Sequence, residues 1–340
     1  MQDSEKRAEA LLARLERGGL VIDGDVHISD PAALPDWQER RRAEDPNYFH
    51  GRTISAEDAV AEMDAAGVDM ALVWQNPAAT TYGNDPCANY HALLEANRYI
   101  AEAAARYPDR FIPAGWTDPK ALGLQHACDL VDRLTGEMGM AIVKMNPAQN
   151  AFRMASEPVM RVVEHIVARG AVPAFHFGAD TPYTPAEDLR ALAEAFPQVP
   201  VIGVHMGGGG AAYPDADETY AKARQYGLEV PNIFYILSAK RDTHIESDLI
   251  AYTAAGPEAA ARIACASDAP YGRMAWNFGG FRAMFDTLRA GVPPDPRLAP
   301  GMFTDAVVAG YMGDNLARLA AGALRGWLAQ RADTRAADAG

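Results

Sequence analysis

The chain has 340 residues, of which 49% are hydrophobic and 22% are charged, and its formal net charge is −14. This composition is typical of a globular protein with one large α/β domain or two ordinary ones. The negative charge disfavours binding to nucleic acid or to an anionic membrane. Three cysteines form no Cys-x-x-Cys pair, and no apolar stretch resembles a signal peptide or a membrane span. A cytoplasmic protein is therefore expected.

Short apolar segments alternate with amphipathic segments along the chain. A helix is predicted over residues 1–18, and eight strands are predicted after it. Two of the helices between the strands have capping-box signatures, Ser55 with Asp58 and Thr184 with Glu187. The predicted strands cover residues 21–28, 70–75, 110–116, 140–146, 172–178, 199–206, 232–239 and 262–269, and the clearest helices cover 55–67, 89–107, 157–170 and 184–196.

Eight strands that alternate with helices predict a (β/α)8 TIM barrel with additional N-terminal and C-terminal helices. The barrel is expected to occupy residues 19–325 as a single domain. Residues 326–340 are expected to hold the end of a C-terminal helix and a tail, frayed over 330–340. A doubly wound sheet is the alternative, but it would carry a nucleotide-binding glycine fingerprint after the first strand, and none is present.

The segment between the first strand and the first barrel helix, residues 29–54, is long for a connection in a compact domain. Loops of this length are usually functional or disordered. Its aromatic and basic residues favour a loop that covers the substrate. They are Trp37, Tyr48, Phe49, His50 and Arg52.

The first strand, VIDGDVHI, carries Asp23, Asp25 and His27 at alternate positions. Side chains alternate between the two faces of a strand, so these three side chains share one face. Buried carboxylates beside a histidine are costly unless a positive group pairs with them. Either this face is wet, or a cation lies against it.

The ends of other predicted strands also carry polar residues, and in a TIM barrel these ends form the active site. A lone strand-end histidine is more often a hydrogen-bonded rim residue than a metal ligand. Several imidazoles and carboxylates on one rim instead favour a site for zinc, manganese or iron. The rim residues are Asp25, His27, Lys144, His176, His205 and Asp268.

Six segments together resemble the amidohydrolase superfamily, in the branch of aminocarboxymuconate-semialdehyde decarboxylase and its hydrolase relatives. In the family's order they are IDGDVH, VKMNP, FHFG, FPQVPVIGVHMGGG, ASDAPYG and GDNLARLAAG. The resemblance implies one divalent metal ion bound by Asp25, His27, His176 and Asp268. It also implies that Asp268 acts as acid or base and that His205 is a catalytic residue but not a ligand.

The first motif departs from the family's usual His-x-His, because Asp25 takes the first position. A metal is still expected, with zinc as the first candidate. Manganese is the second candidate, because a carboxylate ligand shifts the preference toward oxygen-loving ions. Asp23 resembles an acid often found two residues earlier in the family. It is expected to orient a ligand by hydrogen bonding.

Two chemistries fit this predicted site. In a hydrolase, the metal would lower the pKa of a water from about 16 toward 7. Asp268 would take its proton, and His205 would stabilise the oxyanion formed at a lactone, ester or amide. In a decarboxylase, Asp268 or His205 would protonate the carbon that loses carbon dioxide from an aromatic or muconate-type acid. Hydrolysis is the first expectation, and a catalytically silent barrel is the third.

Basic residues at or beyond the strand ends favour a small-molecule substrate that carries a carboxylate. The residues predicted to bind this substrate are Lys144, Trp116, Arg52, His50, Arg273 and Lys240. The protein is expected to form a homodimer.

Overall fold

The computed structural model describes residues 2–33, 54–178, 181–208, 216–240 and 242–338. Most of the predicted covering loop, including Trp37, Tyr48, Phe49, His50 and Arg52, lies outside the described residues. No described helix is long and apolar enough to cross a membrane.

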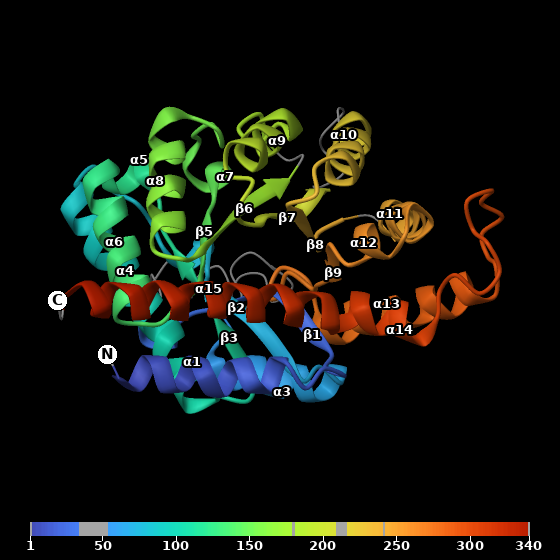
Figure 1. The fold of residues 1–340 in the computed structure, drawn as a ribbon, viewed down its shortest axis with the longest axis horizontal. Helices are drawn as coiled ribbons and strands as arrows, with labels where there is room; N and C mark the ends of the chain where they lie inside the picture. The colour runs from blue at the N-terminus through green and yellow to red at the C-terminus, as the bar shows by residue number, and fades with distance from the viewer. Residues whose placement is uncertain (1, 34–53, 179–180, 209–215, 241, 339–340) are drawn as a thin grey trace, which may run out of the picture.

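Parallel strands form the closed barrel that the sequence predicts, and helices surround it (Figure 1). Strands β3 and β4 are one barrel strand interrupted at Ala114, whose N–H donates to the Val73 carbonyl. The barrel closes where the His27 N–H donates to the Ala269 carbonyl at 2.7 Å. The strands are β1 Ile22–Ile28, β2 Met70–Gln75, β3 Phe111–Pro113, β4 Gly115–Trp116, β5 Ile142–Met145, β6 Val172–Gly178, β7 Val201–Gly208, β8 Ile233–Leu237 and β9 Ile263–Cys265.

The strands are buried on both faces, as is usual for parallel sheets covered by helices. The main covering helices are α3 Ala56–Ala66, α4 Pro86–Arg106, α6 Leu124–Gly136, α8 Glu157–Ala168, α9 Ala186–Ala195, α10 Ala216–Glu229, α11 Asp242–Ala255 and α13 Met274–Arg289. Short helices are η1 Pro31–Ala33, η3 Pro77–Ala79, α5 Pro119–Leu122, α7 Pro147–Asn150, α12 Pro257–Ala260, α14 Asp305–Ala309 and η4 Gly310–Asp314. The outer helices are α1 Gln2–Leu15 and α15 Asn315–Asp338.

One of the two predicted capping boxes is present. Ser55 and Asp58 exchange side-chain to backbone hydrogen bonds at the start of α3. The prediction at Thr184 is wrong, because its hydroxyl donates to the Gly178 carbonyl at 2.6 Å and closes the turn after β6. Helix α9 begins after Pro185 without a side-chain cap.

The C-terminal residues continue as helix α15 to Asp338, so the prediction of a frayed end over residues 330–340 is wrong for the described part. Helices α1 and α15 run side by side (Figure 1). Arg331 and Arg335 both pair with Glu5 of α1. These long-range ion pairs tie the end of the chain to its beginning.

The segment GDNL fastens α15 to the barrel. A Cβ atom at Gly313 would lie 1.9 Å from the Leu20 carbonyl oxygen, so only glycine allows this approach to the chain entering β1. Asn315 donates to the carbonyls of Ala260 and Ile263, where β9 begins. The motif therefore holds the two strands that meet at the barrel seam.

Replacement of the N-cap serine tests the local stability of α3. Ser55→Ala is expected to lower the free energy of unfolding by about 1 kcal/mol, because the Asp58 N–H loses its acceptor. Ser156 precedes α8 without a side-chain cap hydrogen bond. Ser156→Ala should therefore lower the free energy of unfolding less than Ser55→Ala when both are measured by urea titration. Equal losses would contradict the assignment of Ser55 as the stabilising cap.

Candidate metal centre

Four acidic and imidazole side chains meet at the carboxyl end of the barrel. Potential ligand atoms of Asp25, His205 and Asp268 lie within 4.8 Å of one another. His27 Nε2 lies 3.4 Å from Asp25 Oδ1 and 3.6 Å from Asp268 Oδ1. All four residues are at most 9% exposed. The structure thus brings together residues that are more than 240 positions apart in the sequence.

His176 adjoins this cluster from β6. Its Nδ1 lies 3.1 Å from Nε2 of His205, and the two ring centroids are 4.6 Å apart. His176 therefore reaches the cluster on the side of His205.

Two residues of the cluster have left-handed backbone conformations. His205 has φ 79° and Asp268 has φ 58°. Non-glycine residues in this region are strained, and such strain is concentrated at functional sites. Strand β9 ends at Cys265, so Asp268 stands in the turn after it and not in a strand that reaches 269, as the sequence predicted.

The Asp25 carboxylate is fully buried and has three hydrogen-bond donors. Oδ1 accepts from Trp74 Nε1 at 2.8 Å and from Lys144 Nζ at 3.1 Å. Oδ2 accepts from Ser238 Oγ at 2.9 Å. Burial alone would raise the pKa of Asp25, but the Lys144 ammonium and His27 hold it well below its usual value. Asp25 is therefore ionised near neutral pH.

Lys144 provides part of the positive charge that the first strand requires. Its side chain is 1% exposed, and its ammonium lies 4.4 Å from the ring centroid of Trp74 and 5.2 Å from that of Trp116. Aromatic faces attract a desolvated cation. The ammonium is held against Asp25 by both the carboxylate and the two rings.

Hydrogen bonding fixes the tautomer of His27. Its Nδ1 lies 2.9 Å from the Gln75 carbonyl oxygen, which can only accept. In the neutral ring, Nε2 then carries a lone pair that faces the carboxylates of Asp25 and Asp268. Three electron-rich atoms so close together require a cation or a proton among them. Burial and Lys144 lower the pKa of His27, but the Asp25 and Asp268 carboxylates raise it above its ordinary value overall, so without a metal ion the proton is favoured.

A similar argument fixes the tautomers of His205 and His176. The Ser238 hydroxyl donates to the Asp25 carboxylate, so it accepts from Nδ1–H of His205 at 2.8 Å. Burial lowers the pKa of His205 to about 4, so this ring is neutral. Its Nε2 then accepts from Nδ1–H of His176. The other ring nitrogen of His176, Nε2, is the atom through which this residue could bind a metal.

The donor set fits a divalent metal ion. Lone pairs of His27 and His176 and the carboxylates of Asp25 and Asp268 are the ligand types that zinc and manganese use. The Nδ1–H of His27 bonds to a backbone carbonyl, the outer contact typical of ligating histidines.

Asp23 lies behind the cluster and is fully buried. Its carboxylate accepts from the backbone N–H and hydroxyl of Ser267 and from the Asp25 N–H at 3.2 Å. Burial raises the pKa of Asp23 to about 7. Asp23 thus ties β1 to the segment that carries Asp268.

The residues predicted to bind substrate lie in different places. The ring of Trp116 packs edge-on against His27, with centroids 5.9 Å apart. Lys240 is fully buried in an ion pair with Asp248, so its ammonium is not available to a substrate. His50 and Arg52 lie outside the described residues.

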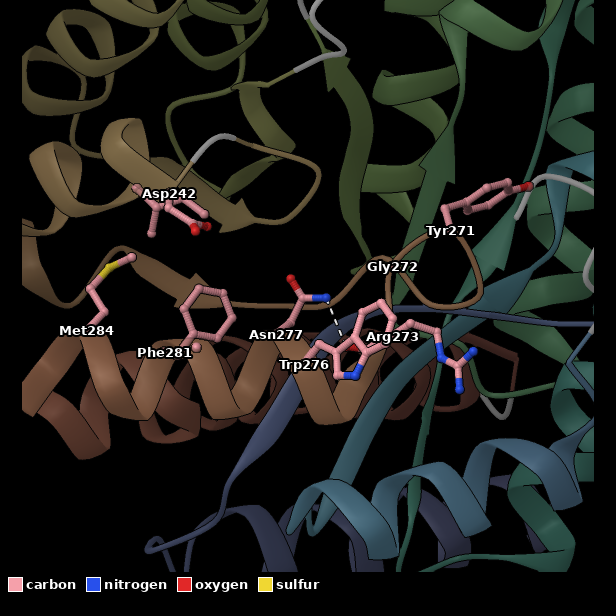
Figure 2. A pocket seen from close by; sticks show the side chains of 10 residues that line it. Asp242, Tyr271, Gly272, Arg273, Trp276, Asn277, Phe281 and Met284 are labelled. Carbon is pink, nitrogen blue, oxygen red and sulfur yellow. Dashed lines mark hydrogen bonds between the residues drawn. The ribbon is translucent and has the colours of Figure 1, made fainter. Parts of the chain in front are cut away.

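Arg273 pairs with Glu62 at 3.0 Å and lines a cavity of about 340 Å³. Figure 2 shows this cavity between α13, which carries Trp276 and Phe281, and Asp242 on the opposite side. Tyr271 also lines it.

Tyr271 connects this cavity to the cluster. Its ring centroid lies 5.7 Å from that of His27, and its hydroxyl donates to Asn76 Oδ1 at 2.7 Å. Tyr271 therefore stands between the cavity and His27, although Figure 2 shows its ring turned away from Trp276 and Phe281.

Sequence analysis missed Trp74, Ser238 and Tyr271. Ser238 directly follows β8, so its position at a strand end was the available signal. Trp74 lies opposite His27 in the pairing of β1 with β2, which the sequence alone does not reveal.

Comparisons with known proteins identify the family and the fold of this chain. A family model described as an amidohydrolase matches residues 22–319. A search of curated proteins finds no match.

Several solved structures share the fold. The 5-carboxyvanillate decarboxylase LigW of Sphingomonas paucimobilis is 18% identical, with TM-score 0.59 and coverage of 88% of this chain and 98% of that one. The 2,6-dihydroxybenzoate decarboxylase from Rhizobium is 16% identical (TM-score 0.61; 89% and 98%). The dihydroxybenzoic acid decarboxylase of Polaromonas sp. JS666, with bound manganese and 2-nitroresorcinol, is 16% identical (TM-score 0.62; 89% and 97%).

Two serines that follow strands test the hydrogen-bond assignment. Ser238→Ala is expected to lower the free energy of unfolding by about 1–3 kcal/mol, because Asp25 and His205 both lose a buried partner. The Ser29 hydroxyl is buried and has no hydrogen-bond partner among the described residues, so Ser29→Ala should change the free energy of unfolding little. Both are to be measured by urea denaturation in the presence of a chelator, and equal losses would contradict the assignment.

Proposed function

The chain belongs to the amidohydrolase family, and we propose that it is a metal-dependent decarboxylase of a hydroxylated aromatic or muconate-type acid. The proposal is supported by the solved structures of similar fold, which include decarboxylases of aromatic acids. The observation that carries it is the buried Lys144 ammonium beside Asp25, 3.1 Å away.

The residues proposed to hold the metal are Asp25, His27, His176 and Asp268. We place manganese before zinc, because two of these four ligands are carboxylates and a structural relative contains manganese. A bound divalent ion would fix the substrate's carboxylate or hydroxyl group and withdraw electrons from the reacting carbon.

Charge balance favours an anionic substrate. The Asp25 and Asp268 carboxylates are offset in part by the Lys144 ammonium, and a divalent ion would leave these groups with a surplus positive charge, reduced by the ionised fraction of Asp23, whose pKa is raised to about 7. The site is nearly dry, so this charge is poorly screened. A substrate carboxylate would supply the missing negative charge.

Asp268 is proposed as the acid. Cleavage of the bond between the substrate carbon and its carboxylate releases carbon dioxide and leaves the electron pair on carbon. Asp268, whose carboxylate takes up a proton from water before this step, gives that proton to the carbon and returns to a carboxylate, and the product then carries a new C–H bond. His205 is neutral and hydrogen-bonded on both nitrogens, so its proposed role is to hold His176 and the Asp25 side of the site in place.

The body of the substrate is proposed to lie against Trp116 and Tyr271. Trp116 Nε1 is buried and faces the Tyr82 hydroxyl, so a substrate oxygen would compete with that hydroxyl for its N–H. Arg273, in the cavity beyond Tyr271, is proposed to bind a distal polar group.

Hydrolysis of a lactone, ester or amide is the second candidate. It is favoured by the carboxylate of Asp268, which lies beside His27 and can accept a proton from an attacking water. A small-molecule partner follows from either reaction, and a homodimer in the cytoplasm remains a prediction.

Metal analysis with a product assay separates these candidates. Purified protein is expected to hold about one divalent ion per chain, and chelation should abolish activity that manganese restores. Hydroxylated benzoates and muconate-type acids should release carbon dioxide, whereas lactones should remain unchanged. Lactone opening without carbon dioxide release would favour hydrolysis, and full activity without metal would exclude both mechanisms.

Two matched variants test the roles of the acid and the neutral histidine. Asp268→Asn is expected to lower kcat by about 10²–10⁴-fold, because an amide cannot supply the proton. His205→Asn should keep the metal and lower kcat by about 10²–10³-fold. If His205→Asn loses the metal while Asp268→Asn keeps metal and activity, the assigned roles are wrong.

A further inference from the structure

Two strained corners, one within β7 and one directly after β8, carry His205 and follow Ser238. In β7, His205 has φ 79° and Met206 has φ 46°, and after β8, Ala239 has φ 47°. Non-glycine residues persist in this conformation only where surrounding contacts hold them. The contacts that hold these corners therefore determine where the two side chains point.

The buried ammonium of Lys240 makes one of these contacts. It donates to the Met206 carbonyl at 3.1 Å and pairs with Asp248, and both side chains of the pair are 0% exposed. It also lies 4.9 Å from the ring centroid of Tyr220. Lys240 stands at the corner after β8, and its ammonium reaches across to the corner at Met206 in β7.

A close backbone approach makes the second contact. A Cβ atom at Gly208 would lie 2.7 Å from the His205 carbonyl oxygen and 2.9 Å from that of Ala239. The two corners therefore pack on each other at Gly208, and a displacement of one displaces the other.

We propose that Lys240 is a positioning residue for His205. Its ammonium holds the paired corners so that His205 bonds to Ser238 and Ser238 bonds to the Asp25 carboxylate. The inference rests on the proposed function in one respect only, namely that His205 takes part in the reaction. The geometric part, that Lys240 fixes the His205 ring, is tested without activity.

Lys240→Met removes the ammonium and keeps the length of the side chain. Asp248 retains Arg224 at 2.6 Å, so it is not left without a cation. The matched control is Lys222→Met, which removes an exposed lysine paired with Glu187 and Glu218.

The readout is the nuclear magnetic resonance spectrum of protein with ¹⁵N-labelled histidine, loaded with diamagnetic Zn²⁺ and again after chelation. The His205 signals are identified by their loss in His205→Asn. In Lys240→Met they are expected to shift or broaden, whereas in Lys222→Met they should stay in place. Unchanged His205 signals in a folded Lys240→Met protein would overturn the inference, whatever its activity.

Kinetics on the substrate found by carbon dioxide release extend the test. Lys240→Met is expected to lower kcat about 10- to 100-fold with KM changed less than about twofold. In the His205→Asn background the same change should have almost no further effect, because the two residues act as a unit. Independent losses in the double variant would overturn the inference. Full activity of His205→Asn would instead overturn the proposed role of His205 and leave the spectroscopic result standing.

If Lys240→Met does not fold, Gly208→Ala replaces it. The added methyl group presses on the His205 carbonyl from the opposite side of the corner. It is expected to shift the same His205 signals, and a folded Gly208→Ala protein with unchanged signals would overturn the inference.

Discussion

The buried carboxylate of Asp25 is the group on which the site depends. An ionised carboxylate without exposure to water is costly unless donors replace its hydration. Its donors are Trp74 on β2, Lys144 on β5 and Ser238 after β8. They come from separate parts of the barrel, so the charge is compensated only when the barrel has closed. Formation of the fold and formation of the site are therefore one event.

The barrel seam shows the same coupling. Asp23 binds both the N–H and the hydroxyl of Ser267, and the His27 N–H bonds to the Ala269 carbonyl. These contacts flank Asp268, which stands between Ser267 and Ala269 in a strained conformation. The polar residues of the first strand thus position the Asp268 carboxylate in the turn after the last strand, besides contributing potential ligands of their own.

The alternation along VIDGDVHI and the polar strand ends were enough to predict the barrel and the clustering of Asp25 and His27 with distant rim residues. They could not predict that Ser238 faces the cluster while Lys240 does not. Simple alternation along a strand places both side chains on one face, and the left-handed corner at Ala239 breaks this alternation. The extent of the predicted C-terminal helix, which continues to Asp338, escaped prediction for another reason. Its ion pairs with Glu5 join residues more than 320 positions apart, and no local pattern records them.

Solvent access gives the final argument for the acid. Asp25 is 0% exposed, His27 2% and His205 3%, whereas Asp268 is 9% exposed. Each decarboxylation consumes one proton, so the group that supplies it must recover a proton from water before the next turnover. Of these four side chains, Asp268 is the one best placed to do so, and its turn after β9 holds it at the rim. The same solvent access would serve a base in hydrolysis, so it does not distinguish the two reactions. The surplus positive charge around Lys144 does distinguish them, because it favours a substrate with a carboxylate.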